Sequence, residues 1–228
     1  MAYILHIETS TKQCSVAIGY KGKFITEKKL MSEKFSHQEN VHVFIKKALE
    51  EVKLNISELN AVSISKGPGS FTGLRIGVAT AKGICFALDL PLIAINTLEL
   101  MIQPFIKKKE IDFLIPMLDA RRMEVYTAIY DKYGKCVEQT NAHILTESSF
   151  QKTVGDSDCL IIGNGAVKFQ NFKPKIKAHF SDFIHYPSAK EMCSLSWKLY
   201  LNRDFQEINS FEPYYLKDFQ TTRPKNSK

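Results

Sequence analysis

The chain has 228 residues, 44% of them hydrophobic, which is enough to bury a full core as one large domain or two smaller ones. Its five cysteines are widely spaced and form no C-x-x-C pair, which excludes a disulfide framework and a zinc ribbon. Because no basic segment precedes a long apolar run at the N-terminus, we expect no signal peptide, no membrane span and a cytoplasmic location. The net charge of +7 permits nucleic acid or an acidic partner without requiring either.

The first half of the chain predicts a strand meander followed by alternating helices and strands. Residues 3–8, 14–20 and 23–30 alternate in polarity and are separated by short turns, as in an antiparallel meander. Apolar residues then recur with helical spacing from Ser36 to about Lys53. Parallel pairing with right-handed crossovers is expected for the elements that follow. These are strand 61–65, helix 71–88, strand 92–95 and a helix from 97 to about 107.

The second half begins with another meander, so we predict a second, smaller lobe. Its expected strands are 113–118, 124–130 and 134–139, and helix 146–154, strand 159–162 and a final helix 188–202 complete it. The predicted architecture is α/β, with mixed sheets flanked by helices. We place the lobes at residues 1–105 and 106–228, with a flexible tail from about residue 220.

The run KGPGSFTGLRIG, residues 66–77, joins an apolar strand to a helix of small residues through a stiff glycine-proline turn. Ser70 or Thr72 can cap this helix. Such a joint directs backbone N–H groups at whatever lies in front of it, as in many phosphate sites. The spacing of lysine and Ser/Thr does not match a Walker A loop, so a P-loop is not predicted.

The same helix carries Gly73, Gly77 and Ala81 at four-residue intervals, which places them in one stripe. Small residues let another helix approach closely, with Leu74 and Val78 packed around the crossing. This pattern fits internal packing against the first helix, and it fits an external docking face equally well. Each glycine lowers helix propensity by about 1 kcal/mol, so one of the two contacts should offset that cost.

Three polar segments are further candidates, each with a structural alternative. Glu8-Thr9-Ser10-Thr11 sets a carboxylate beside several donors, which suits an anion, a metal-phosphate or only the turn itself. Gly163-Asn164-Gly165 is either a second phosphate turn or a tight connection. The run from Asp119 through Arg121 and Arg122 is either a salt-bridged turn or a functional loop in the cleft between the lobes.

The histidines do not predict a metal site. His37 and His42 are five positions apart on the predicted helix, about 140° around its axis, so they cannot ligate one ion together. No G-x-S-x-G elbow marks a nucleophile. We therefore predict no metal and no catalytic residue.

Taken in order from residue 3 to about 216, these segments resemble the bacterial TsaB family, formerly called YeaZ. The resemblance implies two ribonuclease H-like lobes, as in actin, sugar kinases and the Hsp70 ATPase. It implies a non-catalytic dimerisation subunit that activates a TsaD-type catalytic subunit for threonylcarbamoyl transfer to the adenosine beside the tRNA anticodon. The implied partners are that subunit, a TsaE-type ATPase, tRNA through the complex and, for the chain alone, a homodimer, with no membrane.

The resemblance also assigns roles to residues. Glu8, Thr9, Ser10 and Thr11 become a vestigial phosphate turn, because the family usually has Asp where Glu8 stands. No cofactor is implied apart from ATP at the interface with partner subunits, and the role of Asp119, Arg121 and Arg122 stays open. The alternative is an independent ATP-dependent small-molecule kinase of the same fold. The implied partner interface comprises Phe71, Thr72, Gly73, Leu74, Arg75, Gly77, Val78, Ala81 and Lys82.

Overall fold

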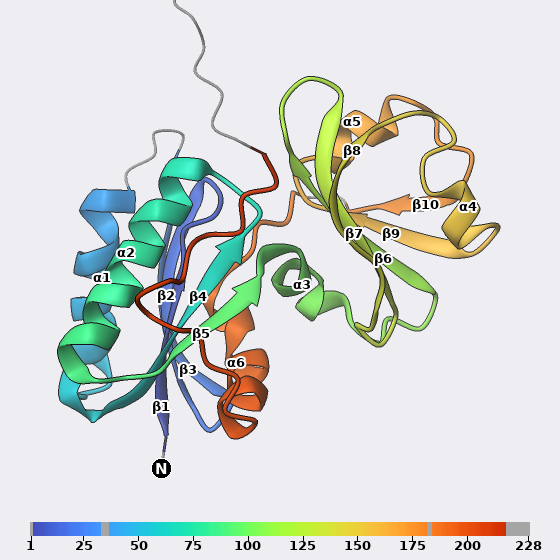
Figure 1. Ribbon diagram of the computed structural model, residues 1–228. Helices are drawn as coiled ribbons and strands as arrows, with labels where there is room; N and C mark the ends of the chain where they lie inside the picture. Colours follow the sequence, from blue (N-terminus) through green and yellow to red (C-terminus); the bar gives the residue numbers. More distant parts are fainter. Residues whose placement is uncertain (1, 33–36, 182–183, 218–228) are drawn as a thin grey trace, which may run out of the picture.

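The computed structural model describes residues 2–32, 37–181 and 184–217, and its strands form two five-stranded sheets (Figure 1). The strand orders are β3-β2-β1-β4-β5 and β10-β9-β6-β7-β8. Both sheets begin with three antiparallel strands and continue with two parallel ones, so they share one topology. The prediction of mixed sheets flanked by helices is confirmed. We call the part built on the first sheet the first lobe and the part built on the second sheet the second lobe.

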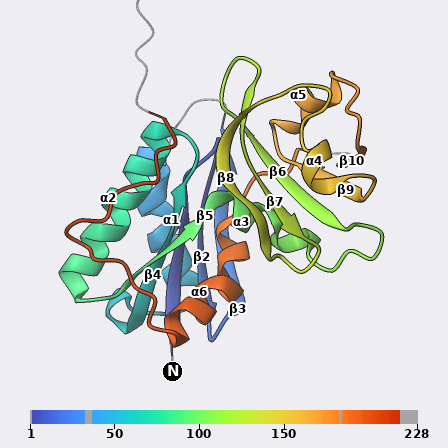
Figure 2. The same ribbon diagram turned by 45° about the vertical axis from the view of Figure 1, so that its right-hand side comes forward.

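In the first lobe, the helices α1 and α2 lie side by side on one face of the sheet (Figures 1 and 2). Val41, Ile45 and Ala48 of α1 are buried with Val16 and Ile18 of β2, which follows the predicted apolar spacing. The predicted helix start at Ser36 lies outside the described residues. The elements are β1 (Tyr3–Glu8), β2 (Gln13–Tyr20), β3 (Lys23–Met31), α1 (His37–Glu51), a 3-10 turn (Ile56–Glu58), β4 (Leu59–Gly67), α2 (Phe71–Leu88) and β5 (Leu92–Asn96).

The second lobe repeats the antiparallel meander of the first. The helix α3 packs on its sheet, with Met101 and Ile102 buried against Leu114 and Leu160. The predicted helix 146–154 is only four residues long, because Phe150 has a left-handed φ of 68° that ends the helix on its N-terminal side. The elements are α3 (Thr97–Ile102), a 3-10 turn (Gln103–Phe105), β6 (Phe113–Asp119), β7 (Glu124–Asp131), β8 (Cys136–Ile144), α4 (Gln151–Val154), β9 (Asp158–Ile162), α5 (Ala166–Gln170) and β10 (Lys177–Phe180).

The last helix, α6 (Met192–Leu201), does not complete the second lobe as predicted; it covers the open face of the first sheet. A short 3-10 turn, Ala189–Glu191, leads into it. Met192 is buried with Ile4, Ala61 and Ile93, whose side chains point away from α1 and α2. Both faces of β1 and β4 are buried and need a cover, which explains the return of the chain. The predicted second lobe, 106–228, is therefore wrong at its C-terminal end.

By length and composition alone, α2 could cross a membrane. In the fold, however, Leu74, Val78 and Cys85 on one side of α2 are buried against the first sheet. Such burial is typical of the core helix of a soluble domain.

Candidate functional site

The space in front of the turn between β1 and β2, where a phosphate would bind, is occupied by the loop before α2 and the first turn of that helix. Thr9 and Ser10 are at most 1% exposed, and Thr9 Oγ1 donates to the carbonyl of Gly73 at 2.8 Å. The amide of Ser70 donates to Ser10 O at 2.7 Å, and a Cβ on Gly69 would lie 2.4 Å from the same oxygen. The structure thus brings together both segments considered for phosphate binding, but it packs one directly on the other.

Glu8 lies fully buried at the base of this turn. Its Oε1 accepts hydrogen bonds from the amide and the hydroxyl of Ser10, both at 2.6 Å, and among the described residues its Oε2 has no hydrogen-bond partner. Burial raises the pKa of Glu8 to about 7, although the hydrogen bonds from Ser10 act in the opposite direction. Because Glu8 is closed off from solvent, its carboxyl group is not open to a bound metal-phosphate.

The Gly73, Gly77 and Ala81 stripe of α2 faces inward. Ser70 caps the helix by accepting from the amide of Gly73 at 3.3 Å. A Cβ on Gly77 would lie 2.2 Å from Thr9 Oγ1 and 2.9 Å from Ile64 Cδ1, so only glycine lets α2 approach the sheet. Internal packing is therefore the correct alternative, but Gly77 packs against the β1–β2 turn and β4 and not, as was expected, against the first helix. Burial excludes Gly73, Leu74, Gly77, Val78 and Ala81 from the predicted partner interface.

The opposite side of α2, which we call the outer face, is exposed to solvent, and the residues at its middle, Ala79 and Gly83, have little or no side chain. Phe86 is 78% exposed, and a Cβ on Gly83 would meet nothing within 4 Å. A mid-helix glycine without a packing partner costs about 1 kcal/mol relative to alanine. Spacing alone could not separate the inner stripe from the outer one, because both recur at helical intervals. The outer face consists of Thr72, Arg75, Ala79, Gly83 and Phe86, with Phe71 and Lys82 half-buried at its edges.

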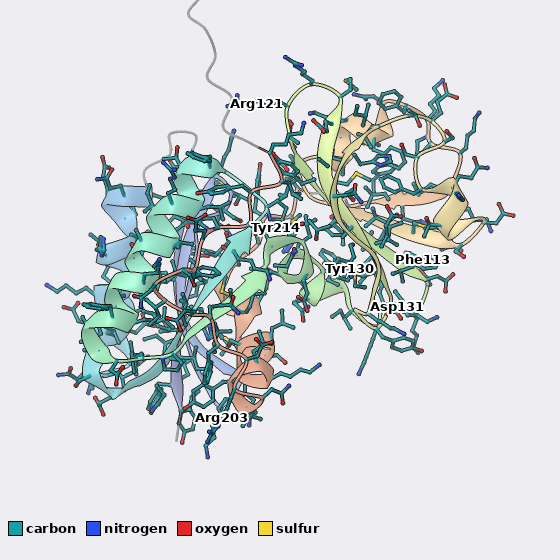
Figure 3. All side chains as sticks on the ribbon, viewed as in Figure 1. Phe113, Arg121, Tyr130, Asp131, Arg203 and Tyr214 are labelled. Carbon is teal, nitrogen blue, oxygen red and sulfur yellow. The ribbon has the colours of Figure 1, made fainter. Side chains whose placement is uncertain are left out.

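Residues 206–217, for which the sequence predicted no contact with the rest of the fold, form a segment that we call the strap. Lys82 Nζ donates to the carbonyls of Asn209 and Phe211 at 3.3 and 3.0 Å. The amide of Tyr214 donates to Lys66 O at 2.7 Å, and Figure 3 shows Tyr214 where the strap passes between the lobes. Most of these contacts involve backbone atoms, so no side-chain pattern announces them.

A cavity of about 600 Å³ lies between the strap and both lobes. Lys66 and Asn96 line it from the first lobe, and Gln139 and Thr140 line it from the second. The side-chain Nδ2 of Asn96 donates to Thr140 Oγ1 at 3.0 Å, which joins the two lobes directly. The cavity thus marks a cleft between the lobes that is lined by polar side chains and bridged by a hydrogen bond.

The hairpin tip between β6 and β7, residues 120–123, stands at one end of the second lobe, opposite Phe113 and Asp131 (Figure 3). Asp119 accepts from Lys168 Nζ and from the amide of Arg121, both at 2.6 Å, so a salt-bridged turn is present. Asn164 Oδ1 accepts from the amide of Asp119 at 3.0 Å. This contact makes Gly163-Asn164-Gly165 a tight connection that supports the tip.

Arg121 and Arg122 are exposed and have left-handed φ angles of 67° and 48°. For residues with a Cβ this conformation costs about 1–2 kcal/mol each. His42 is exposed on α1, and the described residues contain no group of three His, Cys, Asp or Glu side chains that could hold a metal ion.

Two lobes of one topology, meeting across a polar cleft, define the two-lobed class that includes actin, sugar kinases and the Hsp70 ATPase. A solved structure described as an uncharacterized protein similar to peptidase YEAZ, from Pseudomonas aeruginosa, has a TM-score of 0.84. It is 23% identical and covers 95% of this chain and 100% of its own, which shows the shared fold.

The chain belongs to the TsaB family. A "tRNA threonylcarbamoyladenosine biosynthesis protein TsaB" of Buchnera aphidicola subsp. Schizaphis graminum is 35% identical, covering 83% of this chain and 90% of its own. The protein of the same name from Haemophilus influenzae is 27% identical, covering 94% and 93%. A family model described as "TsaD: tRNA N6-adenosine threonylcarbamoyltransferase" matches residues 32–224. These findings give the small-molecule kinase alternative no support.

Proposed function

We propose that the chain acts in tRNA threonylcarbamoyladenosine biosynthesis as a non-catalytic subunit. It pairs with a TsaD-type catalytic subunit and activates it for threonylcarbamoyl transfer to the adenosine beside the anticodon. The names of the relatives and the TsaD family model support this role. One observation carries the non-catalytic part: the β1–β2 turn is filled by Gly69, Ser70 and Gly73 of the same chain.

The outer face of α2 is the proposed docking surface for the catalytic subunit. A chain that the TsaD family model matches along residues 32–224 shares its architecture with the catalytic enzymes of that family, which supports pairing through related helices. Ala79 and Gly83 allow close approach of a partner helix, and Phe86 supplies an exposed aromatic anchor. Of the residues first assigned to the interface, Phe71, Thr72, Arg75 and Lys82 remain in this proposal.

A matched pair of aspartate variants tests this face. Phe86→Asp should abolish co-elution with a TsaD-type subunit in size-exclusion chromatography, and tRNA modification should fall with it. Phe86 is largely exposed, so the melting temperature should stay within about 2 °C. Phe24→Asp, at a half-exposed position on β3, is the control and should still pair. A Phe86→Asp chain that pairs normally would show that the docking surface lies elsewhere.

The same role includes no cofactor held by this chain alone; ATP would bind at the interface with partner subunits. For the isolated chain, we propose a homodimer formed through the outer face. In the complex, a TsaE-type ATPase and tRNA are further partners. The proposed location is cytoplasmic. Calorimetry of the isolated chain should give an ATP affinity no better than roughly millimolar, about −4 kcal/mol. Micromolar binding that is lost in Glu8→Ala would contradict the non-catalytic role.

A further inference from the structure

The charges at the β6–β7 tip are not balanced. Asp119 is paired with Lys168, and Glu124 is paired with Lys217 of the strap. Within residues 2–32, 37–181 and 184–217, neither Arg121 nor Arg122 forms an ion pair. The acidic groups at the tip are therefore neutralised by lysines, and two guanidinium groups remain without a counter-charge.

The backbone holds this arginine pair in a fixed place. The amide of Ala120 donates to Glu124 O at 3.1 Å, and the amide of Glu124 donates to Arg121 O at 3.2 Å. Leu145 N donates to Met123 O at 2.9 Å, which ties the tip to the end of β8. Glycine or asparagine adopts left-handed angles at lower cost, yet two arginines occupy them.

The chemistry of the tip fits a polyanion. Guanidinium groups bind phosphate oxygens through two parallel hydrogen bonds, and they keep their charge at any physiological pH. Cations without protein counter-charges release counterions from a nucleic acid when they bind it. The chain has a net charge of +7, and this total includes three cations in the sequence after Lys217. These are Arg223, Lys225 and Lys228, against the single acidic residue Asp218.

We propose that the β6–β7 tip is a direct RNA contact, in which Arg121 and Arg122 bind backbone phosphates of the tRNA. The inference rests on the proposed function for the identity of the RNA. It assigns the tip to tRNA, whereas the outer face of α2 is assigned to the catalytic subunit. The exposed Met123 within the tip and Ile144 beside it would suit a protein partner instead, and the experiment separates the two cases.

The decisive variant is Arg121→Asn/Arg122→Gly, which removes both charges and relieves the backbone. Fluorescence anisotropy with an unmodified tRNA transcript should show at least tenfold weaker binding by the isolated full chain at low salt. The slope of log K against log salt should fall by about 1 to 2. The melting temperature should rise by a few degrees, because residues suited to left-handed angles replace strained ones.

The control is Lys108→Gln/Lys109→Gln, which removes the same charge from an exposed loop at the other end of β6. It should bind the transcript as the parent chain does. Unchanged affinity and salt slope in the arginine variant, or an equal loss in the control, would overturn the proposal. So would a loss of pairing with a TsaD-type subunit, or of ATP binding, at unchanged RNA affinity. Because the anisotropy uses the isolated chain, failure of the proposed pairing leaves this test intact.

Discussion

The two lobes share one topology but use the equivalent hairpin turn in opposite ways. In the first lobe the β1–β2 turn is buried beneath the loop that begins α2, and its Thr9 is bonded to that helix. In the second lobe the β6–β7 tip is exposed and carries Arg121 and Arg122. The loops before α2 and α5 account for the contrast: Gly69 and Ser70 pack directly on Ser10, whereas Asn164 contacts Asp119 at the base of the tip. One strand order can therefore close a turn for stability or leave it open for contact.

The largest expected effect is on the free energy of unfolding, when a side chain is forced between α2 and the buried β1–β2 turn. Gly77→Arg should destabilise the protein by more than about 4 kcal/mol, because its side chain would be forced against Thr9 and Ile64 with a buried charge. Urea unfolding followed by circular dichroism measures the loss. Gly83→Arg on the exposed side of the same helix should keep the parent stability within about 1 kcal/mol. Equal stability of the two variants would contradict the closed turn.

The buried carboxyl of the closed turn should make stability depend on pH. Burial raises the pKa of Glu8 to about 7 from the ordinary value of 4.5 for a glutamate. The folded state therefore holds a proton that the unfolded state has released between these values, and stability falls as pH rises through this window. The loss attributable to Glu8 is about 3 kcal/mol. Urea unfolding of the parent and of Glu8→Gln at pH 4.5 and 7.5 measures it as a difference.

His6 makes this comparison with Glu8→Gln necessary. Burial lowers the pKa of His6 to about 3, so its contribution to stability is present above pH 6.5 and is lost as pH falls. The two groups act in opposite directions between pH 4.5 and 6.5, and the parent curve alone would look nearly flat. If the stability difference between the parent and Glu8→Gln does not change with pH, Glu8 does not carry the proton assigned to it.

The smallest expected effect concerns the strap, which connects the two lobes. Its Tyr214 amide donates to Lys66 O of the first lobe, and its Lys217 pairs with Glu124 of the second lobe. Lys82→Met removes the two hydrogen bonds to Asn209 and Phe211 and should cost about 1 kcal/mol. Hydrogen exchange should then quicken at the Tyr214 amide. Lys46→Met, at an exposed position on α1, is the control and should leave this amide protected. Unchanged exchange in Lys82→Met would show that the strap is held without Lys82.

Periodicity predicted the strands and helices of the first lobe well, because long alternating or helical apolar runs leave few alternatives. It missed α5 and β10, which have five and four residues, too few for a period to show. It also placed α6 in the wrong lobe, since an amphipathic helix does not encode which sheet it covers. The paired lysines around Asp119 and Glu124 come from Lys168 and Lys217, far away in the sequence. No local pattern could have supplied them.

The return of α6 makes the first lobe discontinuous in sequence, with the second lobe inserted into it as an accessory module. The apolar face formed by Ile4, Ala61 and Ile93 is covered only when residues 192–201 have been synthesised. During translation the inserted module therefore emerges completely while the host lobe still lacks one wall. A cell that stalls synthesis after residue 105 would release a half-closed sheet with exposed apolar surface, a substrate for chaperones rather than a smaller working protein.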